Sequence, residues 1–186
     1  PRPAVAIAAG REFSLAVLDD GTICAWGLNA SGQLGNGVRT TSLSLLPVQV
    51  SGITTARAVA AGNEHALALL ADGTVLAWGA NAAGQLGLGD FKLRRTPVAT
   101  PLRNVAVIRA GGDLSVAITN ARTAIAWGEN SDAQLGTAGA LTTDLSVPLG
   151  VLAGVVDAAP VDRMLLLVGS DGSIRGAGAN DAGSLG

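Results

Sequence analysis

Residues 25–35 read AWGLNASGQLG, and residues 77–87 repeat that order as AWGANAAGQLG. A third version, AWGENSDAQLG, occupies residues 126–136, and a weaker fourth, GAGANDAGSLG, occupies residues 176–186. The copies end on four glycines that are 52, 49 and 50 residues apart, namely Gly35, Gly87, Gly136 and Gly186. Self-similarity at a fixed period of about 50 residues is the sequence signature of a repeat architecture.

The segments around this motif predict strands. Each apolar run is four to six residues long, which is short for a helix, and is bounded by glycine or by Asp-Gly. Asp20-Gly21, Asp72-Gly73 and Asp171-Gly172 each separate two such runs, and this dipeptide is typical of a two-residue hairpin turn. The third copy has Asn120-Ala121-Arg122 there instead, so we expect a hairpin of a different shape.

A further strand is expected at Pro47 and at Pro97, because proline at the start of a strand suits an outer edge. About four short strands in each repeat correspond to one blade of a β-propeller. The sequence therefore predicts a single all-β domain over residues 1–186, a partial or assembling propeller of about four blades. The repeat copies cover approximately residues 1–46, 47–96, 97–147 and 148–186.

The composition suits such a fold. Apolar residues make up 48% of the chain, but aromatic residues only 3%, and 26 residues are glycine, so small side chains must form much of the core. Trp26, Trp78 and Trp127 recur at one repeat position, which Ala177 takes in the fourth copy. We interpret these tryptophans as packing between blades. A stacking or chromophore cluster is the alternative, and the scarcity of other aromatic residues argues against it.

The charge balance and the termini give little sign of other partners. With 12 basic and 14 acidic residues the net charge is −2, which argues against a dedicated polyanion binder. The one basic cluster, Lys92-Leu93-Arg94-Arg95, lacks aromatic stacking platforms, so we interpret it as a solvated loop rather than a nucleic-acid site. No run of 18 apolar residues, signal peptide or lipidation motif is recognised, so no membrane association is expected, and the compartment stays open.

Catalytic and metal-binding residues are scarce. His65 is the only histidine and Cys24 the only cysteine, too few for a zinc site or an evident nucleophile and base pair. Phe13, Leu114 and Met164 occupy the repeat position of His65 in the other copies, which favours a packed structural histidine. We therefore expect no enzymatic activity, cofactor or metal.

The best interaction signal comes from equivalent loop positions, which a propeller places around one face. The position two residues after the repeated Ala-x-Gly glycine holds three carboxylates and one arginine: Glu12, Glu64, Asp113 and Arg163. Arg11, Asn63 and Asp162 lie beside them. These residues predict an acidic arc, closed by one arginine, that docks a basic or polar protein surface. The alternative is that these loops are polar only because they are solvated. A second candidate patch combines Arg39, Lys92, Arg94 and Arg95.

The order Trp-Gly-x-Asn-x-x-Gly-Gln-Leu-Gly, then a proline-containing outer strand and Ala-x-Gly-x-x-His before an apolar strand, resembles the regulator of chromosome condensation repeat. His65 supplies the matching histidine, and the resemblance covers essentially the whole chain. It implies a propeller, usually of seven blades. With about four blade equivalents here, three arrangements stay open: a fragment of a longer propeller, a four-bladed ring closed by the terminal halves, or two chains that exchange halves.

The leading hypothesis is a non-catalytic scaffold that binds a protein partner through the loops of the propeller face. The resemblance implies an alternative, a guanine-nucleotide exchange factor for a small GTPase. It also extends to β-lactamase inhibitor proteins and a plant UV-B photoreceptor, but both roles are expected to need more aromatic residues than this chain has. A further alternative is a structural repeat segment, or an engineered fragment, of a larger propeller.

Overall fold

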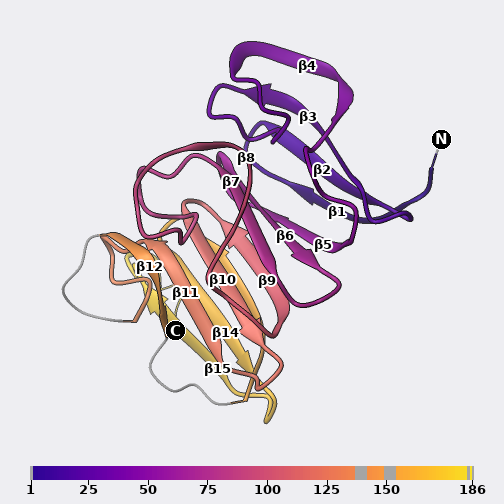
Figure 1. Ribbon diagram of the computed structural model, residues 1–186. Coiled ribbons are helices and arrows are strands. Elements are labelled where there is room, and N and C mark those ends of the chain that lie inside the picture. Colours follow the sequence, from indigo (N-terminus) through magenta and orange to yellow (C-terminus); the bar gives the residue numbers. More distant parts are fainter. Residues whose placement is uncertain (1, 137–141, 149–153, 184, 186) are drawn as a thin grey trace.

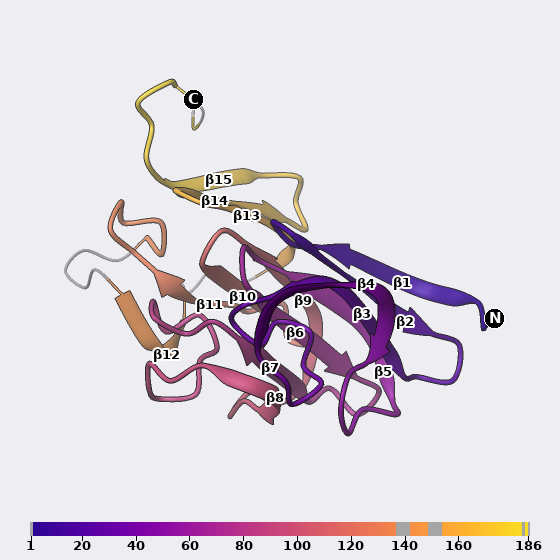
Figure 2. The ribbon, with the colours of Figure 1, turned by 90° about the horizontal axis from the view of Figure 1, so that it is seen from above.

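A computed structural model describes residues 2–136, 154–183 and 185, together with the backbone of residues 142–148. The described strands form four antiparallel sheets that follow one another in chain order (Figure 1). Seen from above, the chain turns from the first sheet to the fourth along an arc, with the two termini apart (Figure 2). The expected all-β, propeller-type architecture is confirmed.

Each sheet is built from strands that are consecutive in the chain. The first contains β1 (Ala4–Ala9), β2 (Phe13–Leu18), β3 (Ile23–Asn29) and β4 (Thr40–Gln49). The second contains β5 (Ala56–Ala61), β6 (His65–Leu70), β7 (Val75–Gly79) and β8 (Arg94–Ala99). The third contains β9 (Val105–Gly111), β10 (Leu114–Thr119), β11 (Ala124–Glu129) and β12 (Thr142–Pro148), and the fourth β13 (Val155–Val161), β14 (Met164–Gly169) and β15 (Ile174–Gly178).

This pairing bears on the arrangements left open by the sequence. The N-terminal strands form a sheet of their own, and so do the C-terminal strands, so no sheet in the described part of the chain combines the two terminal halves. The Pro-Val segments end the preceding sheet, since Val48 pairs with Ala25 and Val98 with Ala77. The sheets therefore end slightly later than the sequence copies, at Gln49 and Ala99.

The hairpins lie where the Asp-Gly pairs predict them, but their type differs from the prediction. Gly21 N donates to Leu18 O at 2.9 Å, and only the glycine has a positive φ, of 77°, so the connection is a wider turn closed by a left-handed residue. The third hairpin has the same shape, contrary to expectation. Arg122 adopts φ 59° there, and its N donates to Thr119 O at 2.8 Å, because the tight turn imposes this conformation even on arginine.

The apolar core lies at the junctions between sheets. One buried cluster joins the first sheet to the second, another the second to the third, and a last one the third to the fourth. Its members are mostly leucine, valine, isoleucine and alanine, as the low aromatic content requires. Each sheet thus buries its apolar faces against its neighbours along the chain.

Tryptophan and glycine form one repeated contact across these junctions. Trp78 Nε1 donates to Gln33 O, and Trp127 Nε1 donates to Gln85 O, each at 2.8 Å. A Cβ on Gly35 would lie only 2.7 Å from Trp78 Nε1. The indole of one sheet therefore lies against the glycine loop of the sheet before it.

The ends of the array depart from this pattern. A Cβ on Gly136 would meet only the Ala177 side chain, at 3.8 Å, because alanine replaces the tryptophan in the fourth sheet. Trp26 lies in the first described sheet and is partly exposed, whereas Trp78 and Trp127 are fully buried. Gly186 lies outside the described residues.

Candidate functional site

Four short loops meet at one end of the sheets and, with the adjoining Asn-to-Gly loops, form what we call the loop face. They are residues 10–12, 62–64, 112–113 and 162–163, each joining the first two strands of a sheet. Because the sheets share one strand order, the equivalent loops come to the same end. Backbone bonds tie them together: Arg11 N donates to Asn63 O at 3.3 Å, and Asn63 N donates to Gly112 O at 2.7 Å.

Glycine makes this close approach feasible. A Cβ on Gly10 would lie 2.6 Å from Gly62 O, and a Cβ on Gly62 would lie 2.5 Å from Gly112 O. Both distances are shorter than real Cβ contacts, so any side chain would push the loops apart. The Asn63 Nδ2 atom also reaches Asp162 Oδ1 of the fourth sheet, at 3.2 Å.

Two carboxylates of the predicted arc are held by the loop of the sheet before them. Glu64 Oε2 accepts a hydrogen bond from Ser31 Oγ at 2.6 Å, and Asp113 Oδ1 accepts one from Gln85 Nε2 at 3.1 Å. Glu12, on the first described sheet, is exposed. None of the ion pairs within the described residues involves Glu12, Glu64, Asp113 or Asp162. These carboxylates thus make no ion pair with a described basic side chain, although Arg11 lines the same hollows as Glu12, Glu64 and Asp113.

Asp113 lies at the centre of this negative field. Partial burial raises the pKa of its carboxyl group above the usual value, and the nearby charges of Glu64, Glu129 and Asp162 raise it further. The hydrogen bond from Gln85 opposes this effect and lowers the pKa. A cation placed beside Asp113 would therefore be stabilised by several carboxylates at once.

Arg163 does not close the acidic arc in the way expected. Its guanidinium pairs with Asp132 at 2.8 Å and with Asp181 at 3.0 Å, in the Asn-to-Gly loops of the third and fourth sheets. These carboxylates raise the pKa of Arg163, so its charge is permanent, but they also occupy its donors. Asp132 and Asp181 were not singled out in the sequence, because only the fold brings them to Arg163.

Two adjoining hollows on the loop face share Arg11, Asn63 and Glu64. One, of about 160 Å³, is also lined by Gln33, and the other, of about 230 Å³, reaches Asp113. Gln33 is 1% exposed, and its Nε2 donor has no hydrogen-bond partner in the described structure. Gln33 and Gln85 were not predicted as site residues from the sequence. Their shared place in the Gly-Gln-Leu-Gly loops is the signal that marks them as equivalent groups facing the next sheet.

His65 is packed below the loop face, away from solvent. It is fully buried, and its Nε2 lies 2.8 Å from Ser115 Oγ, which itself donates to Gln85 O at 2.8 Å. The serine proton is thus committed to the carbonyl, so His65 Nε2 carries the hydrogen and Nδ1 is an acceptor without a described partner. Burial lowers the pKa of His65 to about 3, which keeps the ring neutral at physiological pH.

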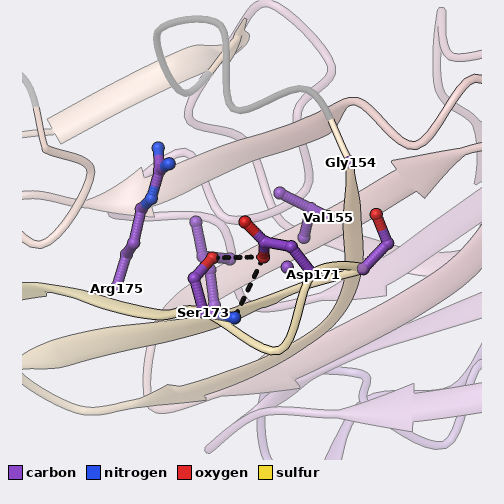
Figure 3. Close-up of a pocket in the computed structure, with 8 residues that line it drawn as sticks. Gly154, Val155, Asp171, Ser173 and Arg175 are labelled. Atoms are coloured by element: carbon purple, nitrogen blue, oxygen red, sulfur yellow. Dashed lines mark hydrogen bonds between the residues drawn. The ribbon is translucent and has the colours of Figure 1, made fainter.

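A smaller cavity, of about 110 Å³, lies at the β14–β15 turn and is shown in Figure 3. Asp171 is its acidic group, and its Oδ1 accepts hydrogen bonds from Ser173 Oγ at 2.6 Å and Ser173 N at 2.9 Å. These two bonds lower the pKa of Asp171 and hold it in the turn. The carboxylate serves the local backbone, so we place the candidate site on the loop face.

The second predicted patch is less concentrated than its sequence suggests. Arg94 pairs with Asp90 at 2.7 Å, and Arg39 Nε donates to Ala30 O at 2.5 Å.

The described part of the chain contains no cluster of three potential metal ligands. It also contains no helix of the length and apolarity needed to cross a bilayer.

Comparisons with known proteins agree with this architecture. The family model described as the regulator of chromosome condensation (RCC1) repeat matches residues 20–69 and 72–118, and a second model of the same description matches residues 4–33 and 56–85. The chain is 42% identical over 93 residues to the ultraviolet-B receptor UVR8 of Arabidopsis thaliana. It is 38% identical over 94 residues to the probable E3 ubiquitin-protein ligase HERC6 of Homo sapiens.

These matches cover 49% of this chain, but only 21% of UVR8 and 9% of HERC6. Among solved structures, the chain aligns with Prp20p from Saccharomyces cerevisiae with a TM-score of 0.82 at 25% identity. The description of that structure names the binding of Prp20p to Gsp1p and histones. That alignment covers 100% of this chain and 45% of Prp20p. The chain therefore spans less than half the length of these relatives.

Proposed function

The chain belongs to the RCC1 repeat family, and from this premise we propose that it is a non-catalytic scaffold that binds a protein partner through its loop face. The observation that carries the proposal is the row of carboxylates without ion pairs at Glu12, Glu64 and Asp113, beside the two hollows. A partner with a basic segment supplies the missing positive charge.

The neighbouring groups suit a peptide segment better than a free cation. Gln33 presents a buried amide donor without a partner, which a backbone carbonyl would satisfy. Glu64 and Asp113 lie in the next two loops and suit the lysine or arginine side chains of the same segment. An extended basic segment would thus meet donors and acceptors along both hollows.

We expect Glu64→Arg to weaken binding of a basic protein about tenfold or more, because it replaces attraction by repulsion at the shared wall of the hollows. Histones are a suitable probe, since Prp20p is described with its binding to them. Binding is measured by biolayer interferometry on the intact chain at two salt concentrations. Asp19→Arg is the matched control, because Asp19 lies in the β2–β3 turn at the other end of the sheet and pairs with Arg2. Equal affinities for the two variants would refute the acidic docking face.

The second candidate is guanine-nucleotide exchange on a small GTPase, favoured by the likeness of the whole chain to Prp20p, which is described as binding Gsp1p. Release of a fluorescent guanine nucleotide from Gsp1p, with and without this chain, separates exchange from simple binding. Acceleration of release would replace the scaffold proposal, whereas binding without acceleration would support it.

A further inference from the structure

A buried glutamine recurs in the Asn-to-Gly loops of the first three sheets, as Gln33, Gln85 and Gln134. The side-chain oxygen of each accepts a hydrogen bond from the backbone nitrogen two residues earlier, at 2.8 Å in the first loop and 2.9 Å in the other two. This bond fixes which end of the amide is the oxygen. The Nε2 donor of each glutamine therefore points away from its own loop.

Two of these donors are satisfied by the next sheet. Gln85 Nε2 donates to Asp113 Oδ1 at 3.1 Å. Gln134 Nε2 donates to Asp162 O at 3.4 Å. Gln33 Nε2, in contrast, has no hydrogen-bond partner among the described residues, although the side chain is 99% buried by the measure that gives it 1% exposure.

The difference has a local cause at the junction of the first two sheets. Glu64 has the repeat position of Asp113, but its Oε2 accepts a hydrogen bond from Ser31 Oγ at 2.6 Å. Ala83 takes the place of Ser31 in the next loop, so Asp113 meets no such hydroxyl there. The serine thus engages the carboxylate whose counterpart satisfies the amide in the next repeat, and Gln33 keeps a free donor.

The hollow of about 160 Å³ lies at this donor. It is lined by Arg11, Glu12, Leu28, Gln33, Asn63 and Glu64. One water molecule needs only about 10–15 Å³, so the hollow has room for a group of several atoms. Its wall combines carboxylates with donors, and a ligand that fits it must carry positive charge and a hydrogen-bond acceptor close together.

Few groups of a protein partner meet both conditions. Lysine and arginine side chains carry donors only, so they would leave Gln33 Nε2 without an acceptor and would bring positive charge towards Arg11. Asparagine and glutamine side chains carry an acceptor but no charge. The first residue of a polypeptide carries both, because its α-ammonium group is three bonds from its own carbonyl oxygen.

We propose that this hollow binds the free amino terminus of the partner, an inference that rests on the loop-face binding proposed above. The α-ammonium group pairs with the carboxylate of Glu64, and the first carbonyl accepts a hydrogen bond from Gln33 Nε2. The basic residues that follow then extend into the adjoining hollow, where Asp113 lies. Capture of a chain terminus is an established mode of peptide recognition.

The test compares two peptides for binding to the whole chain by fluorescence anisotropy. One is a short peptide of alternating alanine and lysine with a free amino terminus and a fluorophore at its carboxyl end. The other is the same peptide with an acetylated amino terminus and one further lysine near the carboxyl end, so that the two net charges are equal. The free amino terminus should bind at least about tenfold more tightly, because acetylation removes the ammonium group and keeps only the carbonyl.

The outcome separates this inference from the proposed function. Equal affinities for the two peptides overturn amino-terminal capture, and the acidic docking face still stands if Glu64→Arg weakens both. If Glu64→Arg weakens neither peptide, the docking face fails and the amino-terminal inference fails with it.

A pair of variants tests the part played by the amide. Gln33→Met keeps the length of the side chain but removes the donor, so the preference for the free amino terminus should fall to within about twofold. Gln134→Met is the matched control, since it loses the same bond to its own loop but does not line the hollow, and it should keep the full preference. Circular dichroism checks that both variants are folded. A full preference in folded Gln33→Met would overturn the proposal, and if that variant does not fold, the peptide comparison on the unmodified chain decides.

Discussion

Replacing Trp127 by alanine is expected to lower the free energy of unfolding by about 3–5 kcal/mol. The side chain is fully buried between the second and third sheets, and its indole nitrogen donates to Gln85 O at 2.8 Å. Truncation opens a cavity against Gly87, where a Cβ would lie 2.8 Å from the indole nitrogen. Gln85 O keeps its second donor, Ser115 Oγ, so most of the loss comes from packing. The change in the free energy of unfolding is measured by urea unfolding that is monitored by circular dichroism.

Trp26→Ala is the matched control, because Trp26 has the same repeat position in the first described sheet and packs on no other described sheet. At a protein concentration where the chain is monomeric, Trp26→Ala should lower the free energy of unfolding by well under half as much as Trp127→Ala does. If the two substitutions cost the same, the tryptophan stabilises its own sheet rather than the junction.

The second prediction concerns pH. His65 has a pKa of about 3 in the folded chain, against 6.5 in the unfolded chain, so the unfolded state binds the proton first as the pH falls. Stability is therefore full above pH 6.5 and is lost progressively between pH 6.5 and pH 3. Since each full pKa unit corresponds to 1.36 kcal/mol, the free energy of unfolding should fall by about 2 kcal/mol between pH 8 and pH 5.

His65→Leu isolates this effect, since the third sheet has Leu114 at the same repeat position. The variant should lose the dependence between pH 6.5 and pH 5, as measured by urea unfolding at a series of pH values. The turn aspartates with lowered pKa, such as Asp72 and Asp171, titrate below this window. An equal slope in the wild type and in His65→Leu would show that another group is responsible.

The sequence predicted the sheets because the repeat places the same apolar positions at a fixed spacing. It also placed Glu12, Glu64 and Asp113 in equivalent loops, because sheets of one topology carry those loops to one end. What it predicted wrongly was local: the hairpins are wider than two residues, and Arg122 takes a conformation that favours glycine.

The periodicity of the sequence could not predict which side chains contact one another. The repeat aligns Arg163 with three carboxylates, but its guanidinium turns to Asp132 and Asp181, which belong to other loops. Ser115 is likewise ordinary in the sequence, and its bond to His65 depends on how two sheets meet. Such contacts depend on distances between repeats, which an alignment of repeats does not contain.

The contact between glycine loop and tryptophan, present at the first two junctions, joins each repeat to its immediate neighbour. A duplicated repeat would thus bring with it both a loop for the next unit and a ring for the previous one, and a deleted repeat would remove one of each. Duplication or loss of a repeat can therefore change the number of units and leave this contact intact at the remaining junctions that carry a tryptophan.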